Sequence, residues 1–173
     1  MPNLAIVQIA TQVWSLVIYA ALAVAFLRPW LKTLGRADAL MAVISTHLFR
    51  YVALSTFAAQ HDGYPISNTA AIEAVTGDVA GAIIAVTAVA MLWWRRPIGI
   101  ALCWLLVIET IADFAVGLRR KALEPLWGLA SGTTWLMLNF YVTLIVVSVP
   151  VLIWQLYARR QEPLEAQQRV VNS

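Results

Sequence analysis

The chain contains 173 residues, of which 61% are hydrophobic and only 12% are charged, and its mean hydropathy is +0.76. This composition lies outside the range of ordinary soluble domains and excludes water as the main solvent. A spanning helix needs about 20 residues, so the length allows one bundle of four to six helices without a large soluble appendage. The net charge of +3 comes from short basic runs between apolar stretches, which is typical of membrane-flanking loops and not of a nucleic-acid groove.

The first two apolar stretches predict two transmembrane helices. Residues 4–27 contain no Lys or Arg and are too long for the apolar part of a secretory signal, so we expect a retained first helix. It should end at 28–30, where an arginine, a proline and a tryptophan combine charge, helix breaker and interfacial aromatic. The second span, about 39–58, is unusual because it carries His47 and Arg50 within an apolar stretch.

The following stretch predicts a loop and two further spans. Residues 60–76 contain no Lys or Arg and are rich in turn formers, so we expect them outside the bilayer, with helix restarting near Ser67. The third span, about 77–94, closes on two tryptophans followed directly by two arginines. A proline opens the fourth span, about 98–118, which has two carboxylates in its second half.

The fifth span begins between residues 126 and 135 and ends at 157–160, which predicts a transmembrane bundle over 1–160 and a polar cytoplasmic tail over 161–173. Basic residues gather in the first connection, the third turn and the tail, which predicts an N-terminus outside and a C-terminus in the cytoplasm. The basic run at 119–121 is an exception, because this orientation leaves it on the outer side. We therefore expect a multi-pass protein of a bacterial inner membrane, in contact with the lipid bilayer.

Polar residues within the spans are predicted to meet at one depth. At about 1.5 Å of rise per residue, Arg50 and Glu109 each lie about twelve positions from the inner end of their span, and Asp113 lies one turn further out. Helical spacing places several of these residues on shared faces, which should point into the bundle because charge facing lipid is costly. The predicted ligand-binding or proton-relay residues of this outer-half layer are His47, Arg50, Asp78, Glu109, Asp113, Gln8, Gln12 and Asn139.

The simplest arrangement of this layer is an ion pair between Arg50 and Glu109, with Asp113 or Asp78 as a second acceptor for the guanidinium fork. One carboxylate would then be left over. A surplus carboxylate in a low-dielectric medium suits a proton carrier, a cation ligand or a general acid or base. A salt bridge that only fixes helix packing explains Arg50 and Glu109 equally well.

Small residues and cofactor motifs give weaker signals. Gly77 with Gly81, and Gly128 with Gly132, match the GxxxG pattern that lets helix backbones approach closely. The single cysteine, Cys103, excludes an intramolecular disulfide and a cysteine-based zinc site. Motifs for phosphate loops, serine hydrolases and zinc proteases are absent from the sequence, so it identifies no cofactor and predicts no metal site and no nucleic-acid partner.

Three functions remain open at this point. The first is binding or translocation of a small polar or cationic solute, with proton coupling as an option; one five-helix chain is small for a transporter, so a homo-oligomer or a partner membrane subunit is expected. The second is a membrane enzyme for a lipid-soluble substrate, using Glu109 or Asp113 with His47 in acid-base chemistry. The third is an accessory or scaffold subunit whose polar layer only holds the helices together.

Overall fold

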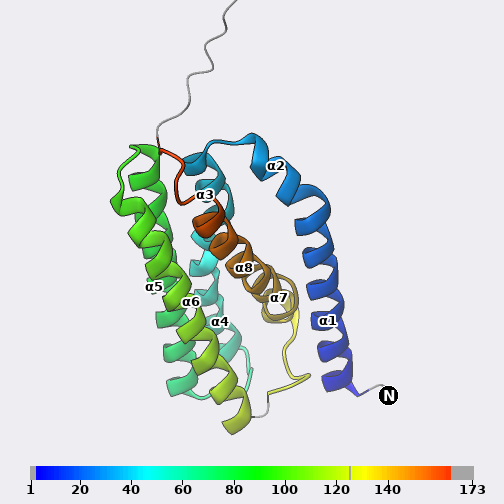
Figure 1. Cartoon of the computed structure of the whole chain (residues 1–173). Helices are drawn as coiled ribbons and strands as arrows, with labels where there is room; N and C mark the ends of the chain where they lie inside the picture. The colour runs from blue at the N-terminus through cyan, green and yellow to red at the C-terminus, as the bar shows by residue number, and fades with distance from the viewer. Residues whose placement is uncertain (1–2, 125, 165–173) are drawn as a thin grey trace, which may run out of the picture.

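The computed structural model describes residues 3–124 and 126–164, and these residues form helices and contain no strand (Figure 1). Five helical segments are long and apolar enough to cross a membrane, which confirms the predicted number. Their bounds are Leu4–Thr33, Arg36–His61, Asn68–Trp93, Ile98–Arg120 and Gly132–Ala158. Most of the predicted polar tail, from residue 165 onward, lies outside the described residues.

The first segment is longer than predicted. Helix α1 (Leu4–Leu22) continues through a π-helical stretch (Ala23–Leu27) into α2 (Arg28–Thr33). The predicted end at residues 28–30 was therefore wrong. Pro29 lies in the first turn of α2, where a missing N–H does not break the helix, and the wide π turn before it allows a change of direction. Figure 1 shows α2 leaning away from α1 toward α3.

The second segment has an unusual centre. Helices α3 (Arg36–Ile44) and α4 (Ser55–His61) flank a ten-residue 3₁₀ helix, Ser45–Leu54, although 3₁₀ runs beyond four residues are uncommon. With three residues per turn, residues three apart line up on one side. His47, Arg50 and Ala53 are accordingly the buried residues of this stretch.

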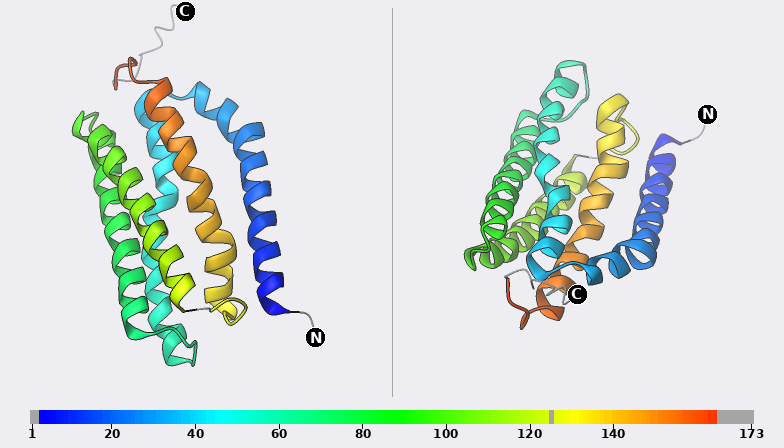
Figure 2. Two further views of the ribbon diagram at one scale, coloured as in Figure 1. Left: turned by 60° about the horizontal axis from the view of Figure 1, so that its bottom comes forward. Right: turned by 90° about the horizontal axis from the view of Figure 1, so that it is seen from above.

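Helices α5 (Asn68–Trp93) and α6 (Ile98–Leu123) form an antiparallel pair, and α5 also packs against the 3₁₀ helix (Figure 2). Helix begins close to Ser67 as predicted, because the Ser67 hydroxyl caps α5 by accepting from the Ala70 N–H at 3.2 Å. The third span therefore starts nine residues earlier than the predicted residue 77. The earlier turns carry polar side chains that a hydropathy reading assigns to the loop.

The last segment consists of α7 (Gly132–Leu136), a π-helical stretch (Met137–Tyr141) and α8 (Val142–Ala158). Its packing against α3 and α6 forms one side of the hydrophobic core. Helix α1 stands at the edge of the bundle and contacts α8 and the preceding π-helical stretch (Figure 2). The fully buried large side chains of the core are Leu31, Leu40, Ile44, Leu92, Leu106 and Leu152.

Candidate functional site

One arginine lies at the centre of the polar cluster. The Arg50 side chain is 1% exposed, and its guanidinium reaches three carboxylates supplied by α5 and α6. Nε donates to Asp78 Oδ1 at 2.8 Å, Nη1 to Glu109 Oε2 at 2.5 Å, and Nη2 to Asp113 Oδ2 at 2.8 Å. Further bonds join Nη1 to Thr110 Oγ1 at 3.0 Å and Nη2 to Glu109 Oε1 at 3.3 Å. The five N–H donors of the guanidinium thus have five acceptor contacts.

The ion pair expected between Arg50 and Glu109 is present, but the predicted choice between two further acceptors was wrong. Asp78 and Asp113 both bind the guanidinium, so each of the three carboxylates has contact with Arg50. No carboxylate of the cluster lacks a contact with Arg50, but the carboxylates carry more negative charge than one guanidinium can balance. With every group ionised, one guanidinium faces three carboxylates, and a formal charge of −2 is left uncompensated within the cluster.

Two glycines on α5 make room for this cluster. A Cβ atom on Gly81 would lie 2.5 Å from Arg50 Cζ and 2.8 Å from Glu109 Oε2, and a Cβ atom on Gly77 would overlap the Asp113 carboxylate. The Gly77 and Gly81 pattern therefore accommodates charged side chains between α5 and its neighbours. The second GxxxG match, Gly128 with Gly132, does not lie on one face of a helix. Gly128 precedes α7, and the two glycines have positive φ values of 77° and 52°.

Substitution of Gly81 by alanine is expected to destabilise the protein by about 1–3 kcal/mol, because the added methyl group displaces the guanidinium or Glu109. Gly117→Ala is the matched control, since a Cβ atom there meets nothing within 4 Å. That change should be neutral or stabilising by up to about 1 kcal/mol, as alanine is the better helix former. Thermal unfolding in detergent compares the two, and equal stabilities would contradict the crowding at Gly81.

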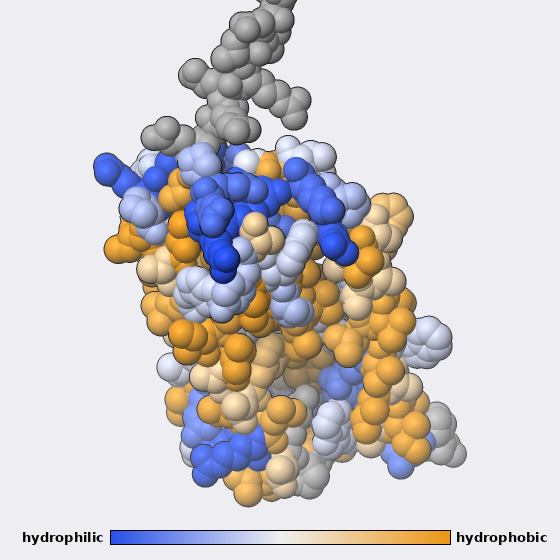
Figure 3. All heavy atoms as spheres, viewed as in Figure 1, coloured by the Kyte–Doolittle hydropathy of each residue, from blue (hydrophilic) through white to orange (hydrophobic). Residues whose placement is uncertain are grey.

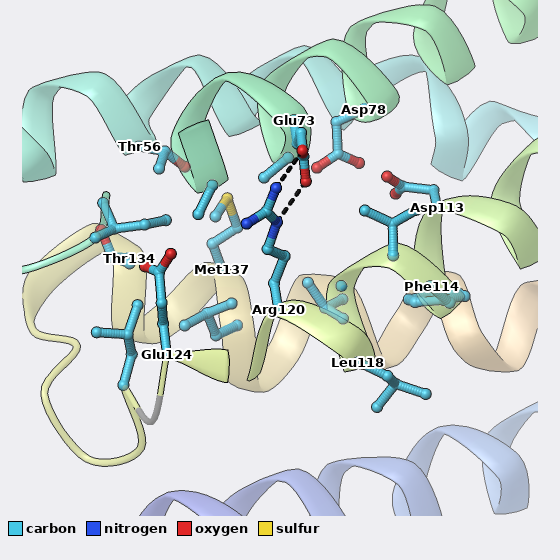
Figure 4. Close-up of a pocket in the computed structure, with 18 of the residues that line it drawn as sticks. Thr56, Glu73, Asp78, Asp113, Phe114, Leu118, Arg120, Glu124, Thr134 and Met137 are labelled. Carbon is cyan, nitrogen blue, oxygen red and sulfur yellow. Dashed lines mark hydrogen bonds and ion pairs between the residues drawn. The ribbon is translucent and has the colours of Figure 1, made fainter. Parts of the chain in front are cut away.

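A cavity of about 220 Å³ opens beside the cluster, and Arg50, Asp78 and Asp113 are part of its wall. Asp78 and Asp113 are 27% and 21% exposed, so each has carboxylate surface that is not covered by the arginine. Figure 4 shows Asp78 and Asp113 side by side at one end of the cavity, near Phe114. The remaining wall is largely apolar and includes Phe114, Val116, Leu118, Leu126, Met137, Leu138, Val142 and Ile145.

The sequence prediction missed the other polar residues around this cavity. Glu73 on α5 accepts two hydrogen bonds from Arg120 on α6, and Figure 4 shows this pair beside the cavity, between its two ends. Arg120 belongs to the basic run that did not fit the predicted orientation, so its exceptional position was a usable signal for an acidic partner. Thr56 on α4 and Thr134 on α7 also line the cavity, and a threonine in an apolar helix gives no comparable signal.

Four residues predicted for the polar layer have other surroundings. His47 Nε2 bonds to Ser148 Oγ at 2.8 Å, Gln12 donates to the Leu138 carbonyl, and Asn139 donates to the Trp135 carbonyl of its own helix. Among the described residues, none of these three is part of the cavity wall. Gln8 does line the cavity, and its Oε1 accepts from the Gly128 N–H at 2.6 Å. The cavity wall therefore includes Gln8 from the predicted layer and, over the described residues, leaves out His47, Gln12 and Asn139.

Arg50 fills the space among the three carboxylates that a bound cation would otherwise take. Over residues 3–124 and 126–164, the structure brings no three His, Cys, Asp or Glu side chains into an arrangement that fits a metal ion. A solute that uses Asp78 and Asp113 must therefore approach them from the cavity.

Glu124, which directly follows α6 and lines the cavity, is hydrogen-bonded to the residue that caps α5. Its carboxylate accepts from the Ser67 hydroxyl at 2.6 Å and from the Ser67 N–H at 3.1 Å, and these bonds hold the pKa of Glu124 below its usual range. A lowered folded-state pKa means that these bonds are present at neutral pH and are lost as the pH falls through the lowered pKa of Glu124. Amide hydrogen exchange at 67–71 should then quicken on acidification, and Glu124→Gln should show the fast rate already at pH 7. A pH-independent exchange rate in the wild type, after correction for intrinsic rates, would contradict this.

Comparisons with known proteins assign the chain to one family. Neither the curated proteins nor the solved structures provide a match to this chain. A family model described as "Domain of unknown function (DUF8737)" matches residues 7–157. That range includes the five candidate spans almost entirely, together with Arg50 and its three carboxylates. The chain therefore belongs to the DUF8737 family.

Proposed function

We propose that this protein is a membrane-embedded binding or translocation protein for a small cationic solute. The observation that carries the proposal is the convergence of three carboxylates on one buried guanidinium, with two of them on the wall of a cavity. In a medium of low dielectric constant this negative surplus attracts a cation strongly and repels an anion. A positively charged solute that enters the cavity would offset part of this negative surplus.

Membrane insertion and orientation are part of the proposal. Five apolar segments of suitable length support a multi-pass protein, and Figure 3 shows a broad apolar region between two more hydrophilic ends. In the proposed orientation the N-terminus is outside and the C-terminus is cytoplasmic. Arg120 then lies on the outer side, where its pairing with Glu73 reduces the effect of its charge on orientation. The cavity would open in the outer half of the bundle.

Binding explains the arrangement better than acid-base catalysis that uses His47. The imidazole bonds to Ser148 on α8 and lies apart from the cavity wall, so a molecule beside Asp113 would not reach it. For translocation, a second copy of the chain or a partner subunit would extend the pathway, because a five-helix chain is small for a transporter. Proton exchange at the carboxylates is compatible with either mode.

Uptake and retention by proteoliposomes test this function with a panel of probes of both charges. Vesicles would be incubated with equimolar methylammonium, choline, phenethylammonium and tyramine as cationic probes and phenylacetate as an anionic probe. Filtration and mass spectrometry then measure what each vesicle retains. The variants are Asp113→Asn and, as the matched control, Asp38→Asn, whose carboxylate pairs with Arg95 at 3.0 Å at the other end of α5.

Wild-type and Asp38→Asn vesicles should retain at least one ammonium compound above the level of protein-free vesicles, and phenylacetate should stay at that level. Asp113→Asn vesicles should lose this retention. If none of the ammonium compounds is retained by the wild type, or if retention is unchanged in Asp113→Asn, the proposed function is wrong.

A further inference from the structure

We infer that the solute is a bifunctional organic ammonium compound, with an ammonium group at Asp78 and Asp113 and a hydrogen-bonding group at the opposite end of the cavity. This inference rests on the proposed function and specifies its substrate class. The end of the cavity with Asp78 and Asp113 accounts for the positive charge of the solute. The other end of the cavity, where Thr56 and Thr134 lie near Glu124, accounts for the second functional group (Figure 4).

Three polar residues on the cavity wall are almost entirely buried and have polar atoms that no other described residue binds. Thr56 is 5% exposed, Thr134 is 4% exposed and Gln8 is 2% exposed, and all three line the cavity. Within the described residues, neither threonine hydroxyl makes a hydrogen bond, and the Gln8 amide nitrogen has no acceptor. Buried polar groups are nearly always satisfied in folded proteins. Because these atoms border the cavity, a molecule that occupies it can supply the missing hydrogen-bond partner.

Other threonines in the same chain show that this is a particular feature of Thr56 and Thr134. The hydroxyls of Thr11, Thr46 and Thr143 donate to a carbonyl three or four residues earlier in their own helices, at 2.8–2.9 Å. This is the usual arrangement for threonine in an apolar helix. Thr56 and Thr134 do not use it, so their hydroxyls are available to a molecule in the cavity.

The two ends are separated along the bundle axis. Figure 4 shows Thr56 and Thr134 on one side, Asp78 and Asp113 on the other, and Met137 between them. Six residues separate Arg50 from Thr56, which corresponds to about 9–12 Å of helical rise. Because side chains reach inward from both ends, one molecule of modest length can contact both.

The volume and lining of the cavity limit the size and character of this molecule. A cavity of roughly 150 Å³ holds one benzene molecule, so about 220 Å³ has room for one ring with short side arms. The rest of the wall is largely apolar, with Met137, Val142 and Ile145 among its residues, and its ion pair of Glu73 with Arg120 carries no net charge. A hydrated inorganic ion would leave this wall and the hydroxyl end unused, whereas an aromatic or aliphatic amine with a distal hydroxyl group fits both.

Isothermal titration of the purified full-length chain with three related probes tests the inference. Tyramine carries both an ammonium and a distal hydroxyl group, phenethylamine lacks the hydroxyl group, and 4-ethylphenol lacks the ammonium group. The variants are Thr56→Val, which removes a hydroxyl at similar volume, and Thr143→Val as its control, because Thr143 bonds within its own helix away from the cavity.

Tyramine should bind the wild type about fivefold to tenfold more tightly than phenethylamine, the effect of one hydrogen bond, and 4-ethylphenol should bind far more weakly than either. Thr56→Val should remove the preference for tyramine, and Thr143→Val should retain it. Equal affinities of tyramine and phenethylamine for the wild type would overturn this inference and leave the proposed function standing. Absence of binding by both amines would also overturn it. Binding of 4-ethylphenol as tight as that of tyramine would contradict the proposed function as well, because the carboxylates would then not select charge.

Discussion

Replacement of Arg50 by methionine is expected to lower the free energy of unfolding by about 3–5 kcal/mol, the cost of breaking a buried ion pair from one side. Arg50 contacts Asp78, Glu109 and Asp113 together. Its removal leaves three carboxylates close to one another with no cation among them. Burial and mutual repulsion then act against the folded state at the same time. Thermal or denaturant-induced unfolding in detergent measures the loss.

Two further variants separate this effect from a general loss of an arginine. Arg95→Met removes the partner of Asp38 from an ion pair that is about one-third exposed, and pairs of this kind contribute only about 0–1 kcal/mol. Adding Asp78→Asn, Glu109→Gln and Asp113→Asn to Arg50→Met removes the unbalanced charge and should restore most of the stability. Wild-type stability of Arg50→Met alone would contradict the geometry of the cluster.

The combined variant also addresses the accessory-subunit alternative. If the cluster serves only to hold α5 and α6 against the 3₁₀ helix, a folded protein without its charges should remain functional. If the cluster binds a cation, the folded combined variant should retain no ammonium compound in the vesicle experiment. Retention at the wild-type level would favour a purely structural role for the four residues.

Asp113→Asn is expected to reduce cation affinity by about tenfold to 150-fold while the protein stays folded. Asp113 lines the cavity, and Arg50 keeps Asp78 and Glu109 as partners when Asp113 is neutralised. A hydrogen bond to a charged group contributes about 1.5–3 kcal/mol, which corresponds to this range of affinity. Titration with tyramine measures the affinity, and thermal unfolding measures the stability of the same sample.

Glu109→Gln provides a comparison within the same cluster. Glu109 forms two bonds to Arg50 but is not part of the cavity wall over the described residues. This change should therefore affect stability more and cation affinity less than Asp113→Asn does. The reverse pattern, with affinity lost in Glu109→Gln and kept in Asp113→Asn, would place the solute elsewhere.

Much of the fold was predictable because the hydrophobic effect and the length of a spanning helix leave few choices. Five apolar stretches gave five helices, and the serine that caps α5 was recognisable at position 67. The end of the first segment was not predictable in the same way. Whether Pro29 stops a helix or begins the next turn depends on the π-helical stretch before it, which has no distinctive composition.

The candidate site was predictable in its charges and only partly in its geometry. Depth estimated from helical rise brought Arg50 and Glu109 together although Arg50 lies in a 3₁₀ helix, because their opposite charges require pairing within an apolar bundle. The partner that each side chain contacts could not be estimated as well. His47 bonds to Ser148 on α8, and Asn139 lies in a π-helical stretch and bonds to its own helix. The role of Thr56 is visible only after the neighbouring helices are placed around it.

Native mass spectrometry of the protein taken gently from its own membranes tests the central claim most directly, which is that Asp113 and the negative surplus around Arg50 hold a small cation. We predict that wild type and Asp38→Asn carry an additional mass of an organic amine of on the order of ten heavy atoms, scaled from a benzene-sized cavity, and that Asp113→Asn lacks it. An unliganded wild-type chain, or the same bound mass in all three proteins, would contradict the claim.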